Sequence, residues 1–154
     1  MFSSAHLALG LIIGKVTGDY PTAIISSTAL DLDHIWPHAR NKVFSGFGLK
    51  KVWFKKFWQA TTFDGDTSRN YLHSLFVLGA IFGIITIFSW TTALVFALGC
   101  LGHLLLDALD NTDLHIFYPF KFLNTIGFVR YYSKTEFWFT VCLFVIYFSL
   151  FLFI

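Results

Sequence analysis

The chain has 154 residues, of which 56% are apolar, 20% aromatic and only 13% charged, with a formal net charge of +2. This length suits one domain, and the composition is typical of a membrane protein and excludes an ordinary soluble protein. Seven of the 11 Lys and Arg residues lie between positions 40 and 69, a membrane-topology signal rather than a nucleic-acid-binding pattern. We expect a single membrane-embedded, all-α domain over residues 1–154.

Two short apolar segments open the chain. Gly18 and Pro21 predict a turn between helices at about residues 4–16 and 21–35. Each helix would be only about 20 Å long, against a hydrocarbon core of roughly 30 Å. We therefore expect a tight hairpin that does not cross the membrane fully.

Three longer apolar segments follow a basic, aromatic stretch at residues 38–70. They predict helices at about residues 71–89, 91–110 and 135–154, each near the roughly 20 residues needed to cross a membrane. Residues 38–70 interleave Lys with Trp and Phe, which favours a loop lying among the lipid headgroups. The pattern predicts a polytopic bundle of about five helices, whose last helix is an anchor or packing helix.

The positions of Lys and Arg predict the orientation of the bundle. Both basic connections must lie on the same side of the membrane, and the positive side is normally cytoplasmic. We expect a multi-pass protein of the cell (inner) membrane, with a cytoplasmic N-terminus and a C-terminus outside.

Seven His and Asp residues fall at the cytoplasmic ends of the first four expected helices. They are His6, Asp31, Asp33, His34, His73, His103 and Asp107. Ionisable groups in hydrocarbon are costly unless they are paired or bind an ion. Imidazole and carboxylate ligands suit divalent metals, so the pattern predicts one or two ions, with Zn²⁺ favoured over Mn²⁺ or Fe²⁺. For His103 and Asp107 alone, the alternative is a hydrogen bond between helices.

Two further residues are candidates for catalysis. Asp33 points about 100° away from His34 on a helix, so it would serve a second ion, orient a His ligand or act as base. Arg69, four residues before His73, would face a phosphate oxygen if the helix already begins there. The alternative for Arg69 is a side chain that snorkels to the interface. His38 and His115 could also be ligands, or ordinary interfacial residues.

Four motifs in order resemble a known family. They are Ser4-Ala-His-Leu-Ala-Leu-Gly10, Leu30-Asp-Leu-Asp-His34, Arg69-Asn-Tyr-Leu-His-Ser74 and Gly102-His-Leu-Leu-Leu-Asp107, with Tyr118-Pro-Phe120 downstream. Over about residues 3–120 the chain is similar to bacterial inner-membrane metal-dependent hydrolases, also described as LexA-binding membrane hydrolases. The resemblance implies hydrolysis, assigns the family's site to the matching His, Asp and Arg residues, and implies a LexA-like regulator as a possible partner.

The chain departs from the family pattern at two motifs. Leu30 stands where the family usually has Pro, which we interpret as a structural difference. Ser68 stands where the family has His, and Leu72 where it has Thr. The change at Ser68 removes a possible ligand or base.

The favoured function is a metal-dependent hydrolase that cleaves a phosphoester of a lipid or another amphiphile at the cytoplasmic face. Membrane lipids and the amphiphilic substrate are then the expected partners, and nucleic acid is not. One alternative is a membrane peptidase or amidase, disfavoured because no Glu lies near the ions as the usual base. The others are a non-enzymatic protein with a structural or transported metal ion, and an interaction subunit that binds a regulator.

Overall fold

The computed structural model describes residues 3–32, 72–111, 114–120, 125–130 and 133–153. Within these residues the chain forms α-helices and one 3₁₀ turn, without any strand. The elements are α1 (Ser3–Thr17), α2 (Tyr20–Thr28), η1 (Ala29–Asp31), α5 (Leu75–Phe88), α6 (Trp90–Leu109) and α7 (Lys134–Phe153). The predicted all-α fold is confirmed, and the predicted interfacial segment 38–70 lies outside the described residues.

The α1–α2 hairpin forms where Gly and Pro predict it. Gly18 has a φ of +80°, which glycine adopts at little cost. The Asp19 side chain caps α2 by accepting a hydrogen bond from the Thr22 N–H at 3.1 Å, and Pro21 follows in the first turn. The α-helix then ends at Thr28 and continues as η1, so it is shorter than expected; residues 33–35 lie outside the described part.

A second hairpin joins α5 to α6 through Ser89 alone. The Ser89 hydroxyl accepts a hydrogen bond from the Thr92 N–H at 3.3 Å and so caps α6. Helix α5 has 14 residues and begins at Leu75, not near residue 71. Helices α6 and α7 are each long and apolar enough to cross a membrane, whereas α1 and α5 are shorter apolar helices.

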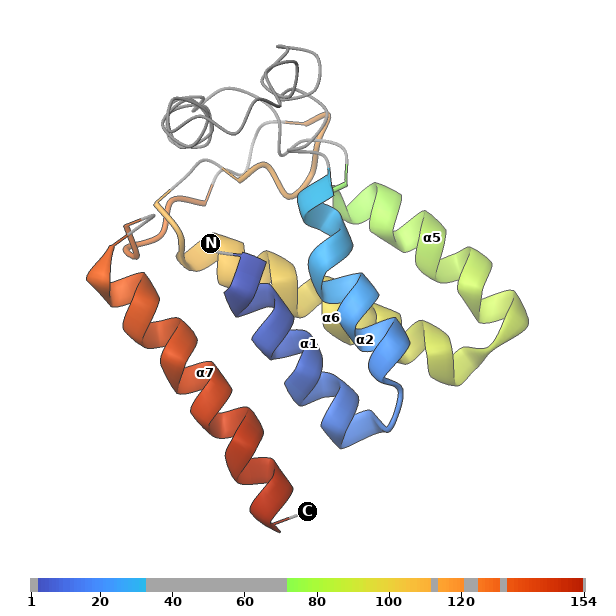
Figure 1. The fold of residues 1–154 in the computed structure, drawn as a ribbon. Helices are drawn as coiled ribbons and strands as arrows, with labels where there is room; N and C mark the ends of the chain where they lie inside the picture. The colour runs from blue at the N-terminus through green and yellow to red at the C-terminus, as the bar shows by residue number, and fades with distance from the viewer. Residues whose placement is uncertain (1–2, 33–71, 112–113, 121–124, 131–132, 154) are drawn as a thin grey trace, which may run out of the picture.

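Helix α6 lies in the middle of the bundle and packs against α1, α2 and α5, while α7 packs mainly against α1 (Figure 1). Lys15, near the end of α1, places its Nζ 4.4 Å from the ring centroid of Phe151. The last turn of α7 therefore lies beside the last turn of α1, at the opposite end of the bundle from the start of α1.

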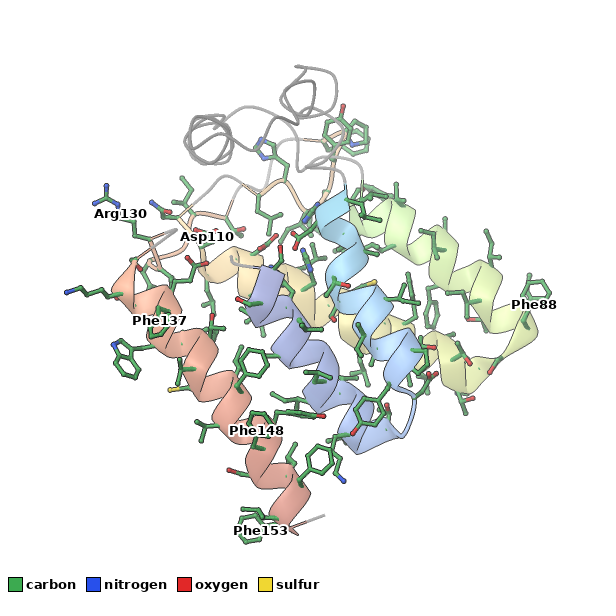
Figure 2. The ribbon with its side chains drawn as sticks, in the orientation of Figure 1. Phe88, Asp110, Arg130, Phe137, Phe148 and Phe153 are labelled. Carbon is green, nitrogen blue, oxygen red and sulfur yellow. The ribbon has the colours of Figure 1, made fainter. Side chains whose placement is uncertain are left out.

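Large apolar side chains cover the outside of the bundle. Phe88 at the end of α5 is 83% exposed and Phe153 at the end of α7 is 84% exposed (Figure 2). The buried core is divided between two clusters, one around Leu104 and the other around Leu106. Apolar residues both inside and outside are what a helix bundle in lipid requires, because lipid tails are as apolar as the core.

The connection after α6 folds back on the end of that helix. The Gly127 N–H donates to the Asp110 carbonyl at 2.7 Å, and the Val129 N–H donates to the Leu109 carbonyl at 2.8 Å. A Cβ atom at Gly127 would collide with the Leu109 backbone, so this contact requires glycine. Farther along, Leu114 and Thr125 pair in an isolated bridge.

Candidate metal centre

Polar side chains from four parts of the chain meet at one end of the bundle. This end includes the start of α1, the end of α2 with η1, the turn before α5 and the C-terminal half of α6 (Figure 1). The contributing residues are His6, Asp31, His73, His103 and Asp107. All are completely buried except Asp31, whose side chain is 20% exposed.

Asp107 lies at the centre of this cluster, and its two carboxylate oxygens face different imidazoles. Oδ1 lies 3.3 Å from His6 Nε2. Oδ2 lies 3.2 Å from His73 Nε2 and 3.4 Å from His103 Nε2. His103 and Asp107 share one face of α6 because they are four residues apart. A carboxylate placed in this way could bind one ion or bridge two.

The His103 ring is held in one orientation by the end of α2. Its Nδ1 lies 2.6 Å from the Ser27 carbonyl oxygen, which can only accept a hydrogen bond. Nδ1 must therefore carry a proton, and in the neutral ring Nε2 presents a lone pair. That Nε2 lies 3.2 Å from His73 Nε2 and 3.7 Å from Asp31 Oδ1.

His6 packs flat on His103, with ring centroids 3.8 Å apart and an interplanar angle of 17°. His6 Nε2 has the 3.3 Å contact with Asp107 Oδ1, but His6 Nδ1 forms no hydrogen bond with a described residue, and neither does the buried Oδ2 of Asp31. Buried polar atoms of this kind normally have a partner, so these positions fit ligands of a cation. This observation supports a metal site on grounds independent of sequence patterns.

The donor atoms form two overlapping groups that could each hold a metal ion. His6, Asp31 and His103 make one group, and His73, His103 and Asp107 make the other, with the ligand atoms of each group within 4.8 Å of one another. His103 belongs to both, but its single free Nε2 can bind only one ion. If two ions were bound, His103 would serve one of them, and Asp107, whose two oxygens face different imidazoles, could contribute to both.

The structure brings together five of the residues predicted for the site. Asp33, His34, His38 and Arg69 lie outside the described residues. His115 belongs to neither group of potential ligands among the described residues.

His73 differs from its predicted setting because it lies in a turn before α5, not in the helix. Leu72 and His73 form a turn, and α5 begins only at Leu75. Arg69 was placed beside His73 on the assumption that both lie in one helix. Leu72 and His73 are not helical, so this assumption does not hold at His73.

Ser27 is a site residue that reasoning from the sequence missed. It contributes its main-chain carbonyl, and every residue has one, so no residue type marks this contact. An indirect signal is present: Gly99 lies one helical turn before His103, and Ser26 and Ser27 form a small-residue pair just before Asp31.

Fold and site together define a membrane protein with a buried His/Asp cluster that could bind a metal ion. The chain matches the family model described as YdjM inner membrane protein over residues 1–154. It therefore belongs to the YdjM inner membrane protein family, which confirms the resemblance derived from the motifs. No curated protein and no solved structure matches the chain.

Proposed function

We propose that this protein is a membrane-embedded, metal-dependent hydrolase that cleaves a phosphoester of a lipid or another amphiphile at the cytoplasmic membrane face. One observation carries the proposal: three imidazole Nε2 atoms surround the two carboxylate oxygens of Asp107 in a buried cluster. The proposal keeps the membrane orientation predicted from the Lys and Arg positions, with the N-terminus, beside the cluster, in the cytoplasm and the C-terminus outside.

The positions of protons in the cluster favour a cation. His103 Nδ1 donates to Ser27, so the His103 Nε2 lone pair faces His73 Nε2 and the Asp107 carboxylate. A lone pair that faces a carboxylate in a dry environment is repelled unless a proton or a metal ion lies between them. A divalent ion satisfies several of these donor atoms at once, and imidazole with carboxylate favours Zn²⁺.

The arrangement also offers a route for substrate. Zn²⁺ would supply Lewis acidity, polarising a phosphoryl oxygen and lowering the pKa of water. Asp31 is the one partly exposed member of the cluster, so it marks the side from which water and substrate would enter. Asp33 as base and Arg69 as the group that neutralises phosphate charge stay predictions from the sequence.

An apolar groove close to the cluster supports an amphiphilic substrate. It has a volume of about 460 Å³ and is lined by Phe76, Val77, Tyr118, Pro119 and Phe120. Phe76 follows His73 by three residues, and the Ser74 hydroxyl next to His73 donates a hydrogen bond to the Tyr118 carbonyl at 2.7 Å, so the groove lining lies near a potential ligand. An acyl chain would suit this lining, with its phosphate directed at the cluster.

A non-enzymatic protein with a structural metal ion is the second candidate. It is favoured by the complete burial of His6, His73, His103 and Asp107, since structural sites are closed whereas catalytic sites keep an open position. The two candidates differ in what removal of the ion changes: a structural ion supports folding alone, and a catalytic ion also supports turnover.

The test is phosphate release from lipid phosphates by protein in nanodiscs, measured with Zn²⁺ and with chelator. We expect chelation to abolish release and Zn²⁺ to restore it, and Asp107→Asn to lower release by at least about 100-fold, because the variant loses an anionic ligand. Ser149→Ala is the matched control, since this hydroxyl bonds to the Val145 carbonyl of its own helix. Release that is unaffected by chelator contradicts metal catalysis. A lower melting temperature after chelation, with no release under any condition, supports the structural ion.

A further inference from the structure

The end of α2 crosses α6 at Gly99, one helical turn before His103. A Cβ atom at Gly99 would collide with the Ser26 hydroxyl, and it would lie 2.8 Å from the Ser26 Cβ and 3.2 Å from the Ser27 nitrogen. Part of this contact is with the α2 backbone, which cannot rotate away as a side chain can. The close approach of α2 to α6 therefore depends on the absence of a side chain at Gly99.

Gly10 makes the equivalent contact from α1. A Cβ atom there would collide with the Ser27 hydroxyl and lie 3.0 Å from the Ile24 Cα. The Ser26–Ser27 pair is thus enclosed between α1 and α6. Both hydroxyls bond to carbonyls of their own helix, at Ala23 and Ile24. The small size of these serines therefore permits the close contact. Their hydroxyls bond to α2 itself and not to the His/Asp cluster.

This close approach places two main-chain carbonyls of α2 on side chains of α6. The Ser26 carbonyl accepts a hydrogen bond from Cys100 Sγ at 3.6 Å, and the Ser27 carbonyl accepts one from His103 Nδ1 at 2.6 Å. Carbonyls in the last turn of an α-helix lack an intrahelical partner four residues on, and α2 ends at Thr28. The end of α2 is therefore a ready acceptor for the His103 ring.

We propose that Gly99 and Gly10 are positioning residues, which hold the Ser27 carbonyl against His103 and so keep its Nε2 available to bind a divalent cation. The two glycines act through His103 and touch neither ion nor substrate. This inference rests on the metal-binding part of the proposed function. Loss of an outer partner of a His ligand typically weakens metal affinity by about 10- to 100-fold, which is the effect expected here.

The first test needs no substitution at the glycines. Metal-free wild-type protein with ¹⁵N-labelled histidine is placed in nanodiscs, and long-range ¹⁵N–¹H correlations report which ring nitrogen carries the proton. The His103 signals are assigned by comparison with His103→Gln. We expect the Nδ1–H tautomer, and a His103 ring protonated at Nε2 instead overturns the proposal.

The second test measures Zn²⁺ affinity by competition with a chelating dye. We expect Gly99→Ala to bind Zn²⁺ about 10- to 100-fold more weakly and to lose the uniform Nδ1–H signal. Gly83→Ala is the matched control, because a Cβ atom at that α5 glycine meets nothing within 4 Å.

A compensating change separates this role from a general loss of structure. Ser26→Gly in the Gly99→Ala background removes the side chain that the new methyl group meets, so it should restore part of the affinity and the Nδ1–H signal. Wild-type affinity in Gly99→Ala contradicts the inference. If the wild type binds no Zn²⁺, the proposed function fails, whereas the tautomer in the metal-free protein still decides whether Ser27 sets the His103 ring.

Discussion

Helices α6 and α7 have the same length and comparable apolarity, yet the bundle uses them differently. Each has 20 residues and suits a membrane span. Helix α6 buries eight residues, including His103 and Asp107, whereas α7 buries only Glu136 and Thr140. Phe137 and Phe148 of α7 are exposed on the outside of the bundle (Figure 2).

The difference shows that apolarity and internal spacing carry separate information. Apolarity makes both helices suitable for lipid. On α6, Gly99, His103 and Asp107 repeat every four residues and so share one face, which combines a close helix contact with two potential ligands. Helix α7 has no comparable series, and its expected role as an anchor or packing helix stays a prediction.

Substitution of a buried polar side chain should give the largest difference between α6 and α7. We expect Asp107→Asn to reduce Zn²⁺ affinity by at least about 100-fold, more than loss of an outer partner, because a charged ligand becomes a neutral amide. Thr140→Val in α7 should leave the affinity unchanged, since this hydroxyl bonds to Glu136 in its own helix. Bound zinc per protein, measured by elemental analysis, checks both. Equal zinc in Asp107→Asn and wild type would remove Asp107 from the ligand set.

Packing should give the next largest effect, and α6 provides its own control. Leu104 is 5% exposed in the core, whereas the adjacent Leu105 is 65% exposed. Leu104→Ala should lower the free energy of unfolding by about 2 to 3 kcal/mol through the cavity it leaves. Leu105→Ala should lower it by less than about 0.5 kcal/mol. Denaturant unfolding in micelles measures both, and similar losses would show that α6 is not oriented as described.

The smallest effect concerns accessibility of the two cysteines. Cys100 of α6 is buried and Cys142 of α7 is exposed. We expect maleimide to modify Cys142 at least about tenfold faster in detergent-solubilised native protein, because access limits thiol reaction. Mass spectrometry of peptides over time gives the two rates, and full denaturation should equalise them. Faster modification of Cys100 would show that Cys100 of α6 is more accessible than Cys142 of α7, contrary to the structure.

The sequence predicted the convergence of the potential ligands better than their detailed settings. The short connections at Gly18 and Ser89 define two antiparallel hairpins, each of which brings its own His and Asp residues to one level. The expectation that both basic connections lie on one side of the membrane then placed the two hairpins with these residues at the same end. His73 also reaches that end, but in a turn. The Leu75 N–H donates to the Ile116 carbonyl at 2.9 Å, a contact from 41 residues away that the local pattern around His73 does not reveal.

The orientation of His103 was likewise beyond local reasoning. It depends on a main-chain oxygen of Ser27, and hence on how closely α2 and α6 approach. The sequence marks where small residues stand, but the pairing of Gly99 with Ser26, and of Gly10 with Ser27, is a property of the packed bundle. Residue type predicts potential ligands well and predicts the groups that orient them poorly.

The segment 114–120 is hydrogen-bonded to the residues that directly follow His73. Ile116 accepts from the Leu75 N–H, and the Tyr118 carbonyl accepts from the Ser74 hydroxyl at 2.7 Å. The same two hydrogen bonds thus anchor one wall of the apolar groove and the residues directly after His73. These two hydrogen bonds join the groove wall to the residues next to His73, so we expect a ligand that displaces Tyr118 to shift the His73 imidazole as well.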